Sequence, residues 1–327
     1  MRRLAGVHGG FRHRVWRLET ERGTYAIKQL SANTDLNDPE VVNNYNVSEA
    51  IAEAFATHGV PTIVALKSGA EYVQVIDGVG YLLHPWSNAV ALDIRDVSER
   101  HALEVAGILA RMHGTDLDVT CVRQHEFDVH PEENIVLLVD IARGFHLDLS
   151  ATLQRGLPTF LEIVDAQRSA IQVLEHHLVV SHGDLDQKNV LWDAEGKPTL
   201  IDWESAKKLN PTYEILVEAL NWSGIGSQFD RDLFGKILRA YERAGGVIEH
   251  DSVAAAYHCV LGDWVNWLMF NVGRCVDLED GDQRATGKKQ IDFALAALQR
   301  IMDHVPGLLP VSNPCAGEAN DQRSVNV

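Results

Sequence analysis

Two short acidic segments near the middle of the chain constrain its fold more than any other feature. They read SHGDLDQKNVLWD (181–193) and LIDWE (200–204). Apolar residues flank each acid, and a glycine marks a turn between the segments, so we predict a hairpin of two short strands. This hairpin would bring Asp184, Asn189 and Asp202 to neighbouring ends of rigid elements, where their side chains could converge on one point.

The residue types at this point indicate a chemistry. Magnesium prefers oxygen ligands and is bound through one or two carboxylates together with substrate phosphates. Phosphoryl transfer also needs an acid that accepts or orients the attacking hydroxyl, and a lysine on the nucleotide phosphates. The alternating segment TYAIKQL (24–30) supplies Lys28, and the helical segment that follows supplies Glu49 or Glu53 to hold this lysine.

A glycine-containing stretch, GVHGGFRHRVW (6–16), precedes these residues. Its glycines would let the backbone approach an anionic nucleotide closely, although glycines more often mark an ordinary turn. The stretch therefore supports a nucleotide site only in combination with Lys28. Within the first acidic segment, we expect His182 to form a structural hydrogen bond rather than to transfer a proton.

The chain divides into a strand-rich part and a helical part. In the first part, residues 48–59 are predicted to form a helix capped by Ser48; the second part opens with a predicted helix at 98–114, capped by Ser98. The predicted strands are VWRLET (15–20), TYAIKQL (24–30), EYVQVI (71–76) and GYLLHPW (80–86). Further helices are predicted at 160–178, 213–222, 232–244, 253–272 and 289–305.

This order predicts an α+β fold of two lobes, a β lobe followed by a helical lobe. Residues 1–86 would form a small, antiparallel, nucleotide-binding β lobe, with a linker at 82–88. Residues 89–305 would form the larger helical lobe, which would carry the catalytic loop and the acceptor-binding helices. Residues 306–327 lack periodicity and are predicted to be a flexible tail.

Composition narrows the range of partners. The chain of 327 residues carries a net charge of −17, so it lacks the excess of Lys and Arg that binding to nucleic acid or an anionic membrane requires. The charge favours a cationic ligand, although a solvated acidic surface explains it equally well. The cysteines are scattered, and no apolar run is long enough to span a membrane. We expect no signal peptide and a cytoplasmic location. We also expect a monomer or a homodimer.

The two acidic segments resemble motifs of the aminoglycoside phosphotransferase and choline kinase-like family, a branch of the protein-kinase-like fold. HGDLDQKNVL is similar to the HGDxxxxN catalytic loop of that family, and LIDWE is similar to its metal-binding segment. The spacing from Asp184 to Asn189 also equals that of the protein-kinase motif HRDxxxxN. The resemblance covers residues 6–220 and implies a two-lobe kinase-like fold that uses ATP, or GTP, with Mg²⁺.

The resemblance also implies residue roles. Asp184 would be the catalytic base, and Asn189 and Asp202 would hold magnesium and complete the catalytic set. The residues implied to bind the nucleotide are Gly10, Val15, Lys28, Glu49, His84 and Trp86. Of the two helix acids, Glu49 matches the family position better than Glu53. The backbone near His84 and Trp86 would read the adenine edge, and Val15 would pack on the base.

The chain departs from the family pattern at several positions. Phe11, Arg12 and His13 stand where the family usually has small polar residues near the phosphates. Asp186 stands where a histidine is frequent, and Glu214 replaces a later supporting acid. None of these departures removes one of the residues implied to contact metal or phosphate.

The resemblance thus implies a kinase of a small hydroxylated molecule, with an aminoglycoside-like or other cationic antibiotic as the acceptor. A metabolite such as choline, homoserine or a sugar is the alternative acceptor. The Trp-rich stretch GDWVNWLMFNVGR (262–274) with Asp263 lies where the family builds its acceptor pocket, although such a stretch is more often helix core. A nucleotide-binding pseudokinase without turnover is the alternative from another class, and the intact Lys28 and Asp184 argue against it.

Overall fold

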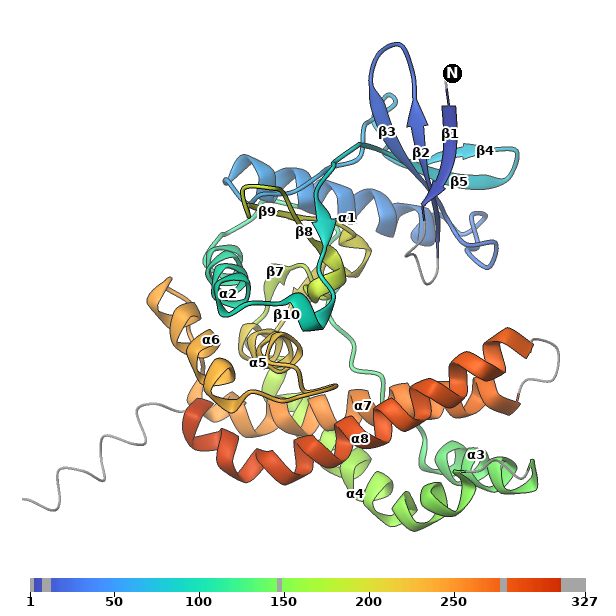
Figure 1. Cartoon of the computed structure of the whole chain (residues 1–327), viewed down its shortest axis with the longest axis vertical. Coiled ribbons are helices and arrows are strands. Elements are labelled where there is room, and N and C mark those ends of the chain that lie inside the picture. The colour runs from blue at the N-terminus through green and yellow to red at the C-terminus, as the bar shows by residue number, and fades with distance from the viewer. Residues whose placement is uncertain (1–2, 8–12, 146–148, 277–280, 313–327) are drawn as a thin grey trace, which may run out of the picture. The chain divides into compact units, whose positions relative to one another are not determined.

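The computed structural model describes residues 3–7, 13–145, 149–276 and 281–312 (Figure 1). The strands are β1 (Arg3–Val7), β2 (Arg14–Glu19), β3 (Thr24–Gln29), β4 (Gln74–Ile76), β5 (Val79–Pro85), β6 (Val90–Ala91), β7 (Val179–Ser181), β8 (Val190–Trp192), β9 (Pro198–Leu200) and β10 (Lys207–Leu209). The α-helices are α1 (Pro39–Thr57), α2 (Glu99–His113), α3 (Glu132–Gly144), α4 (Ser150–Leu174), α5 (Pro211–Trp222), α6 (Arg231–Arg243), α7 (Val253–Val276) and α8 (Gly281–Ser312). Short 3₁₀ helices are η1 (Ile94–Asp96), η2 (Gln187–Asn189), η3 (Trp203–Ser205) and η4 (His250–Ser252).

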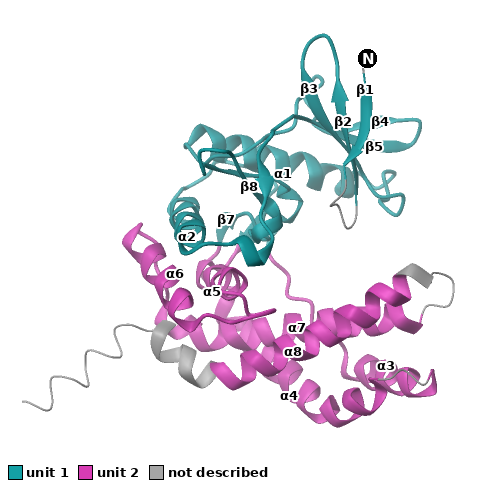
Figure 2. Cartoon of the chain, viewed as in Figure 1, with its two compact units in different colours: residues 1–124, 179–208 teal, residues 125–178, 209–327 magenta. Residues whose placement is uncertain are grey.

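The chain forms two compact units (Figure 2). Unit 1 comprises residues 1–124 and 179–208, and unit 2 comprises residues 125–178 and 209–327. The hairpin with Asp184 therefore belongs to the same compact unit as the strand-rich part of the chain. The expected linker at residues 82–88 stays a prediction.

A five-stranded sheet in the order β1-β2-β3-β5-β4 forms the strand-rich part of unit 1. All its neighbours are antiparallel, with Val15 opposite Lys28 and Lys28 opposite Leu82. The small antiparallel sheet and the mainly helical remainder confirm the α+β class. Strand β1 was not among the predicted strands.

The N-cap of helix α1 lies ten residues before the predicted cap, Ser48. It is Asp38, whose side chain accepts a hydrogen bond from the Glu40 N–H, and Pro39 occupies the first turn. Ser48 is therefore not the cap: it lies inside the helix and its hydroxyl donates to the Asn44 carbonyl. The prediction for α2 is confirmed, since Ser98 accepts from the His101 N–H at its N-terminus.

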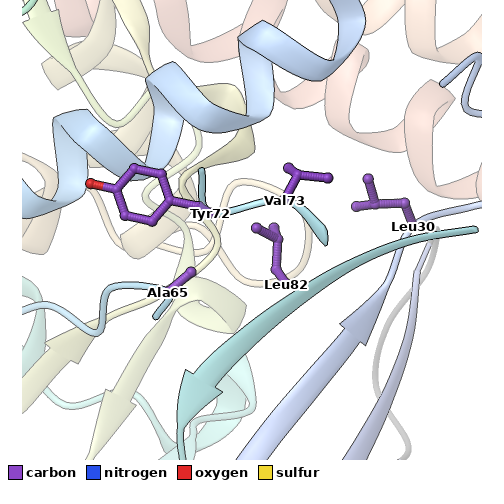
Figure 3. Packing of buried hydrophobic residues seen from close by; sticks show 5 residues of the cluster. All are labelled: Leu30, Ala65, Tyr72, Val73 and Leu82. Carbon is purple, nitrogen blue, oxygen red and sulfur yellow. The ribbon is translucent and has the colours of Figure 1, made fainter. Parts of the chain in front are cut away.

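Helix α1 covers the sheet of unit 1 and closes a small apolar core. Five buried side chains form this core, as Figure 3 shows: Leu30, Ala65, Tyr72, Val73 and Leu82. Val42, Tyr45 and Ala50 of α1 pack against it. Burial of these apolar side chains holds β3 and β5 against the helix, and this fixes the strand that carries Lys28.

Unit 2 is helical, and long helices pack along one another in it. Helices α7 and α8 lie side by side, and α4 packs against α7 (Figure 1). The buried Gln167 amide of α4 lies against Gly262 of α7, and a Cβ at position 262 would overlap it. Helix α3 was not predicted. Helix α8 extends to Ser312 rather than ending at Val305, and residues 313–327 of the predicted tail lie outside the described residues.

None of the helices in the described part of the chain combines the length and the apolar character needed to cross a lipid bilayer.

The core in Figure 3 gives a stability prediction. Leu82 is 2% exposed, so Leu82→Ala should leave a cavity and lower the free energy of unfolding by about 2–5 kcal/mol. Leu4→Ala is the matched control, because Leu4 is 49% exposed and should lose less than about 1 kcal/mol. Chemical denaturation followed by tryptophan fluorescence measures both changes. Equal losses in the two variants would contradict the assignment of Leu82 to the core.

Candidate active site

The hairpin predicted from the two acidic segments is present. Strand β8 pairs antiparallel with β9, with Val190 opposite Leu200. Beyond the strands, the Ile201 N–H donates to the Asn189 carbonyl at 3.0 Å. The buried His182 side chain bonds to the Ile201 carbonyl at 3.0 Å, which confirms its structural role. These bonds place the loop with Asp184 and Asn189 beside the segment that carries Asp202.

Two neighbouring side chains hold the Asp184 carboxylate. The Asn189 amide nitrogen donates to Asp184 Oδ2 at 3.0 Å and to the Asp184 carbonyl at 2.7 Å. The Lys188 ammonium lies 3.1 Å from Asp184 Oδ2 and 2.7 Å from Asp186 Oδ2. Asp184 is therefore oriented by a neutral donor and by a cation.

The ion pair between Lys188 and Asp186 explains why an aspartate stands at position 186, where a histidine is frequent in the family. Burial acts to lower the pKa of Lys188, but the carboxylates of Asp184 and Asp186 outweigh it and raise this pKa above its ordinary value. Burial raises the pKa of Asp186, although Lys188 opposes this effect. Asp186 thus acts as a counter-ion that keeps Lys188 charged and beside Asp184.

Lys28 contacts the hairpin of the same unit. Its ammonium donates to Asp202 Oδ1 and, at 2.9 Å, to Glu204 Oε2. Burial acts to lower the pKa of Lys28, but Asp202 and Glu204 outweigh it and raise this pKa. Val15 lies opposite Lys28 in the β2–β3 pair, and its predicted contact with the base stays a prediction.

The expected partner of Lys28 is different from the observed one. Within the described residues, the ion pairs of Lys28 are with Asp202 and Glu204 and not with Glu49. Glu49 is buried on α1, accepts from the Ala65 N–H at 2.7 Å and pairs with His84 at 3.1 Å. The other candidate acid, Glu53, pairs with Lys67 and Tyr72. The expected Lys28–Glu49 pair is therefore corrected by the structure.

The linker backbone differs from the expectation in one group. The Trp86 N–H donates to the Thr24 carbonyl at 3.1 Å, so it continues the β3–β5 ladder rather than facing a ligand. The His84 side chain is taken by Glu49. If this backbone binds adenine, it must do so through groups on the edge of the strand that faces away from β3. Gly10 lies outside the described residues.

The geometry of Asn189 and Asp202 fits a hard divalent cation. Asn189 is buried, and Asp202 has left-handed backbone angles (φ 64°, ψ 60°), an uncommon conformation for a residue other than glycine that recurs at functional sites. Together they offer one carboxylate and one amide oxygen, a set that magnesium completes with substrate phosphates and water. Within the described part of the chain, no three His, Cys, Asp or Glu side chains are grouped to hold a metal alone.

Glu204 and His13 are residues whose contacts the sequence did not predict. His13 Nε2 lies 2.8 Å from Glu204 Oε2, the oxygen that also accepts from Lys28. Burial acts to raise the pKa of Glu204, but the hydrogen bond from His13 and the charge of Lys28 outweigh it and lower this pKa to about 2. The sequence signal for Glu204 was its position two residues after Asp202 and directly after the apolar Trp203.

With this geometry established, comparisons with known proteins identify the family. The model of the phosphotransferase enzyme family matches residues 3–256. The chain belongs to this family. It is therefore a phosphotransferase, as expected from the two motifs. No curated protein sequence matches the chain.

Solved structures of this fold cover most of the phosphotransferase. A spectinomycin phosphotransferase in complex with ADP and spectinomycin is 12% identical, with a TM-score of 0.63 over 91% of this chain and 93% of the other. Choline kinase LicA from Streptococcus pneumoniae is 16% identical, with a TM-score of 0.58 over 91% and 93%. Macrolide 2'-phosphotransferase MphH from Brachybacterium faecium is 15% identical, with a TM-score of 0.56 over 88% and 92%. At these identities the likeness confirms the two-lobe protein-kinase-like fold.

Gly183 of the phosphotransferase allows a test of the loop geometry. Its φ is +76°, and a Cβ there would collide with the Ser205 carbonyl oxygen. We expect Gly183→Ala to displace the loop from η3 and to lower both stability, by about 2 kcal/mol or more, and phosphotransfer. The matched control is Gly107→Ala in α2, where the Cβ meets no atom within 4 Å and stability should rise or stay unchanged.

Thermal unfolding and ATP turnover measured on both variants check this prediction. Full activity and an unchanged melting temperature in Gly183→Ala would show that the loop does not need the left-handed conformation.

Proposed function

We propose that the protein is an ATP- and Mg²⁺-dependent kinase that transfers the γ-phosphate to a hydroxyl group of a small, cationic molecule, most simply an aminoglycoside-like antibiotic. One observation carries the proposal: the Asp184 carboxylate is held by both Asn189 and Lys188 in the loop that the Asn189–Ile201 bond fixes beside Asp202. Structures of the same fold in complex with ADP and with AMP-PNP support ATP as the donor.

The residues of this chain divide the work of phosphoryl transfer. Asp184 orients the acceptor hydroxyl and takes its proton, and its hydrogen bond from Asn189 keeps the carboxylate in place. Lys28 binds the nucleotide phosphates. Asn189 and Asp202 would hold Mg²⁺, which when bound neutralises charge on the phosphates. Catalysis then comes mainly from positioning and from charge stabilisation, because the protein forms no covalent bond with the phosphate.

A cluster in unit 2 supports a cationic acceptor. Tyr213 donates a hydrogen bond to Asp263 of α7, and the Tyr213 ring packs edge-on against Phe127 at 5.0 Å. Burial raises the pKa of Tyr213 well above its ordinary value, and Asp263 adds to this effect. Tyr213 therefore stays a hydroxyl donor that orients the Asp263 carboxylate. A carboxylate that is held by a neutral donor suits an ammonium group.

There are two alternatives, and the first has specific support. Choline kinase LicA is among the similar structures, and choline is also cationic, so a metabolite kinase fits the same cluster. A pseudokinase that binds nucleotide without transferring phosphate is the alternative from another class. The held Asp184 argues against it, since a protein without turnover has no need of an oriented base.

Turnover with a panel of acceptors tests the proposal. ADP release from MgATP and from MgGTP is measured with aminoglycosides, macrolides, choline, homoserine and simple sugars. We expect a cationic acceptor to stimulate turnover, and Asp184→Asn to lower kcat by a factor of about 10²–10⁴ because the base is lost. Nucleotide affinity in this variant should stay within about twofold of the wild type.

Phosphorylated product identified by mass spectrometry distinguishes transfer from hydrolysis. Full activity in Asp184→Asn would show that Asp184 is not the base. Tight nucleotide binding with acceptor-independent ATP hydrolysis alone would favour the pseudokinase.

Asp263 gives a separate prediction about the acceptor. Asp263→Asn keeps the shape of the side chain but removes its charge, so KM for a cationic acceptor should rise by about tenfold while KM for MgATP stays unchanged. Asp292→Asn, the same change at an exposed position of α8, is the matched control. An unchanged acceptor KM in Asp263→Asn would exclude this cluster from cation binding.

A further inference from the structure

The side chains around Lys28 support an inference that rests on the proposed function. We infer that His13 and Glu204 form a positioning pair that aims Lys28 at the nucleotide phosphates, the role that the resemblance assigned to the helix acid Glu49. Both residues act through Lys28 and not on the reacting atoms.

Glu204 is the shared acceptor of two donors. Its Oε2 lies 2.9 Å from Lys28 Nζ and 2.8 Å from His13 Nε2. Asp202, the other carboxylate on Lys28, is also a candidate metal ligand. Glu204 is therefore the carboxylate partner of Lys28 to which the proposed reaction gives no other task, and it can hold the ammonium while Asp202 serves the metal.

The hydrogen bonds of His13 define its protonation state. The Ser31 N–H donates to His13 Nδ1 at 2.9 Å, so Nδ1 carries no proton. Nε2 must then carry the proton and donate it toward Glu204. His13 is buried, at 6% exposure, and its ring packs edge-on against Tyr45. A neutral, fixed donor of this kind orients Glu204 without competing for the charge of Lys28.

The backbone around Glu204 is anchored as firmly as its side chain. The neighbouring Trp203 is buried, stacks on Phe55 of α1 at 5.5 Å between ring centroids, and donates to Thr62 Oγ1 at 2.6 Å. The Glu204 carbonyl accepts from Arg123 at 2.5 Å. Glu204 therefore presents its carboxylate from a rigid turn, which is what a positioning residue needs.

The carboxylates of Glu49 and Glu53 on α1 have partners other than Lys28. Both oxygens of Glu49 have partners: Oε2 accepts from the Ala65 N–H and Oε1 pairs with His84. Moving Glu49 to Lys28 would leave a buried backbone donor without a partner, at a cost that a new ion pair has to offset. Glu53 is taken by Lys67 and Tyr72.

Charge-neutral variants test the pair by direct titration with MgATP and by steady-state kinetics. Glu204→Gln should raise both the Kd and the KM for MgATP by about tenfold, the loss of one charge-assisted hydrogen bond, with kcat for the bound complex reduced less. His13→Ala should give the same direction of change. His13→Gln, whose amide nitrogen occupies the place of Nε2, should restore most of the affinity. Glu53→Gln is the control and should bind MgATP as the wild type does.

A double-mutant cycle separates positioning from general stabilisation. In a Lys28→Met background, Glu204→Gln should cause less than about a twofold further change in affinity for MgATP, because the side chain through which Glu204 acts is gone. A merely structural role would instead add its full effect in that background.

Each outcome decides between specific alternatives. A tenfold loss of affinity in Glu49→Gln, together with wild-type affinity in Glu204→Gln, would show that the helix acid positions Lys28 and would overturn the inference. A full additional loss in the Lys28→Met background would also overturn it. A wild-type protein that binds no MgATP would refute the proposed function itself. It would also refute the inference that Lys28 is positioned to contact the nucleotide phosphates. Wild-type binding with an insensitive Glu204 refutes only the positioning pair.

Discussion

The buried indole of Trp203 is the constraint on which the site depends. It stacks on Phe55 of α1, lies 4.6 Å from the His182 ring and donates to Thr62, so helix, loop and hairpin meet at one side chain. Burying an aromatic ring of this size stabilises the fold, but only with the flanking residues in one position. Those flanking residues are Asp202 and Glu204, the two acids that contact Lys28. Packing of an apolar residue thus sets the electrostatics of the site.

Short-range sequence signals, such as turn residues and helix caps, predicted the elements that depend on neighbouring residues in the chain. The turn and the apolar flanks of residues 181–204 were enough for the β8–β9 hairpin, and Ser98 was enough for the start of α2. Ser48 failed as a cap because the residues before it, 39–47, are helical without a clear apolar stripe, and the true cap is the Asp38-Pro39 pair. Helix α3 was missed since its buried positions Ile135, Val139 and Ala142 form a narrow stripe next to exposed Val136 and Leu137.

The sequence predicted which residues belong to the candidate site, but it did not predict which of them pair with one another. The two motifs identified Asp184, Asn189 and Asp202 by their spacing, and the alternating segment at residues 24–30 upstream of them identified Lys28. Which acid pairs with Lys28 depends on distances in the folded chain. The sequence offered Glu49 and Glu53, which share one helical face, and gave no basis for Glu204. The contact of His13 with Glu204 joins residues 191 positions apart, and no periodicity reports such a contact.

The balance of charge gives a physical reason for a metal requirement. Lys28 lies between Asp202 and Glu204, and Lys188 lies between Asp184 and Asp186, so two cations face four carboxylates and the cluster carries a net charge of −2. His13 adds no charge, because the Ser31 N–H occupies its Nδ1. An anionic nucleotide is repelled by this excess unless a divalent cation enters with it. On the proposed function, the carboxylates that keep both lysines ordered would therefore make nucleotide binding depend on the metal, and would couple nucleotide affinity to the ion proposed for transfer.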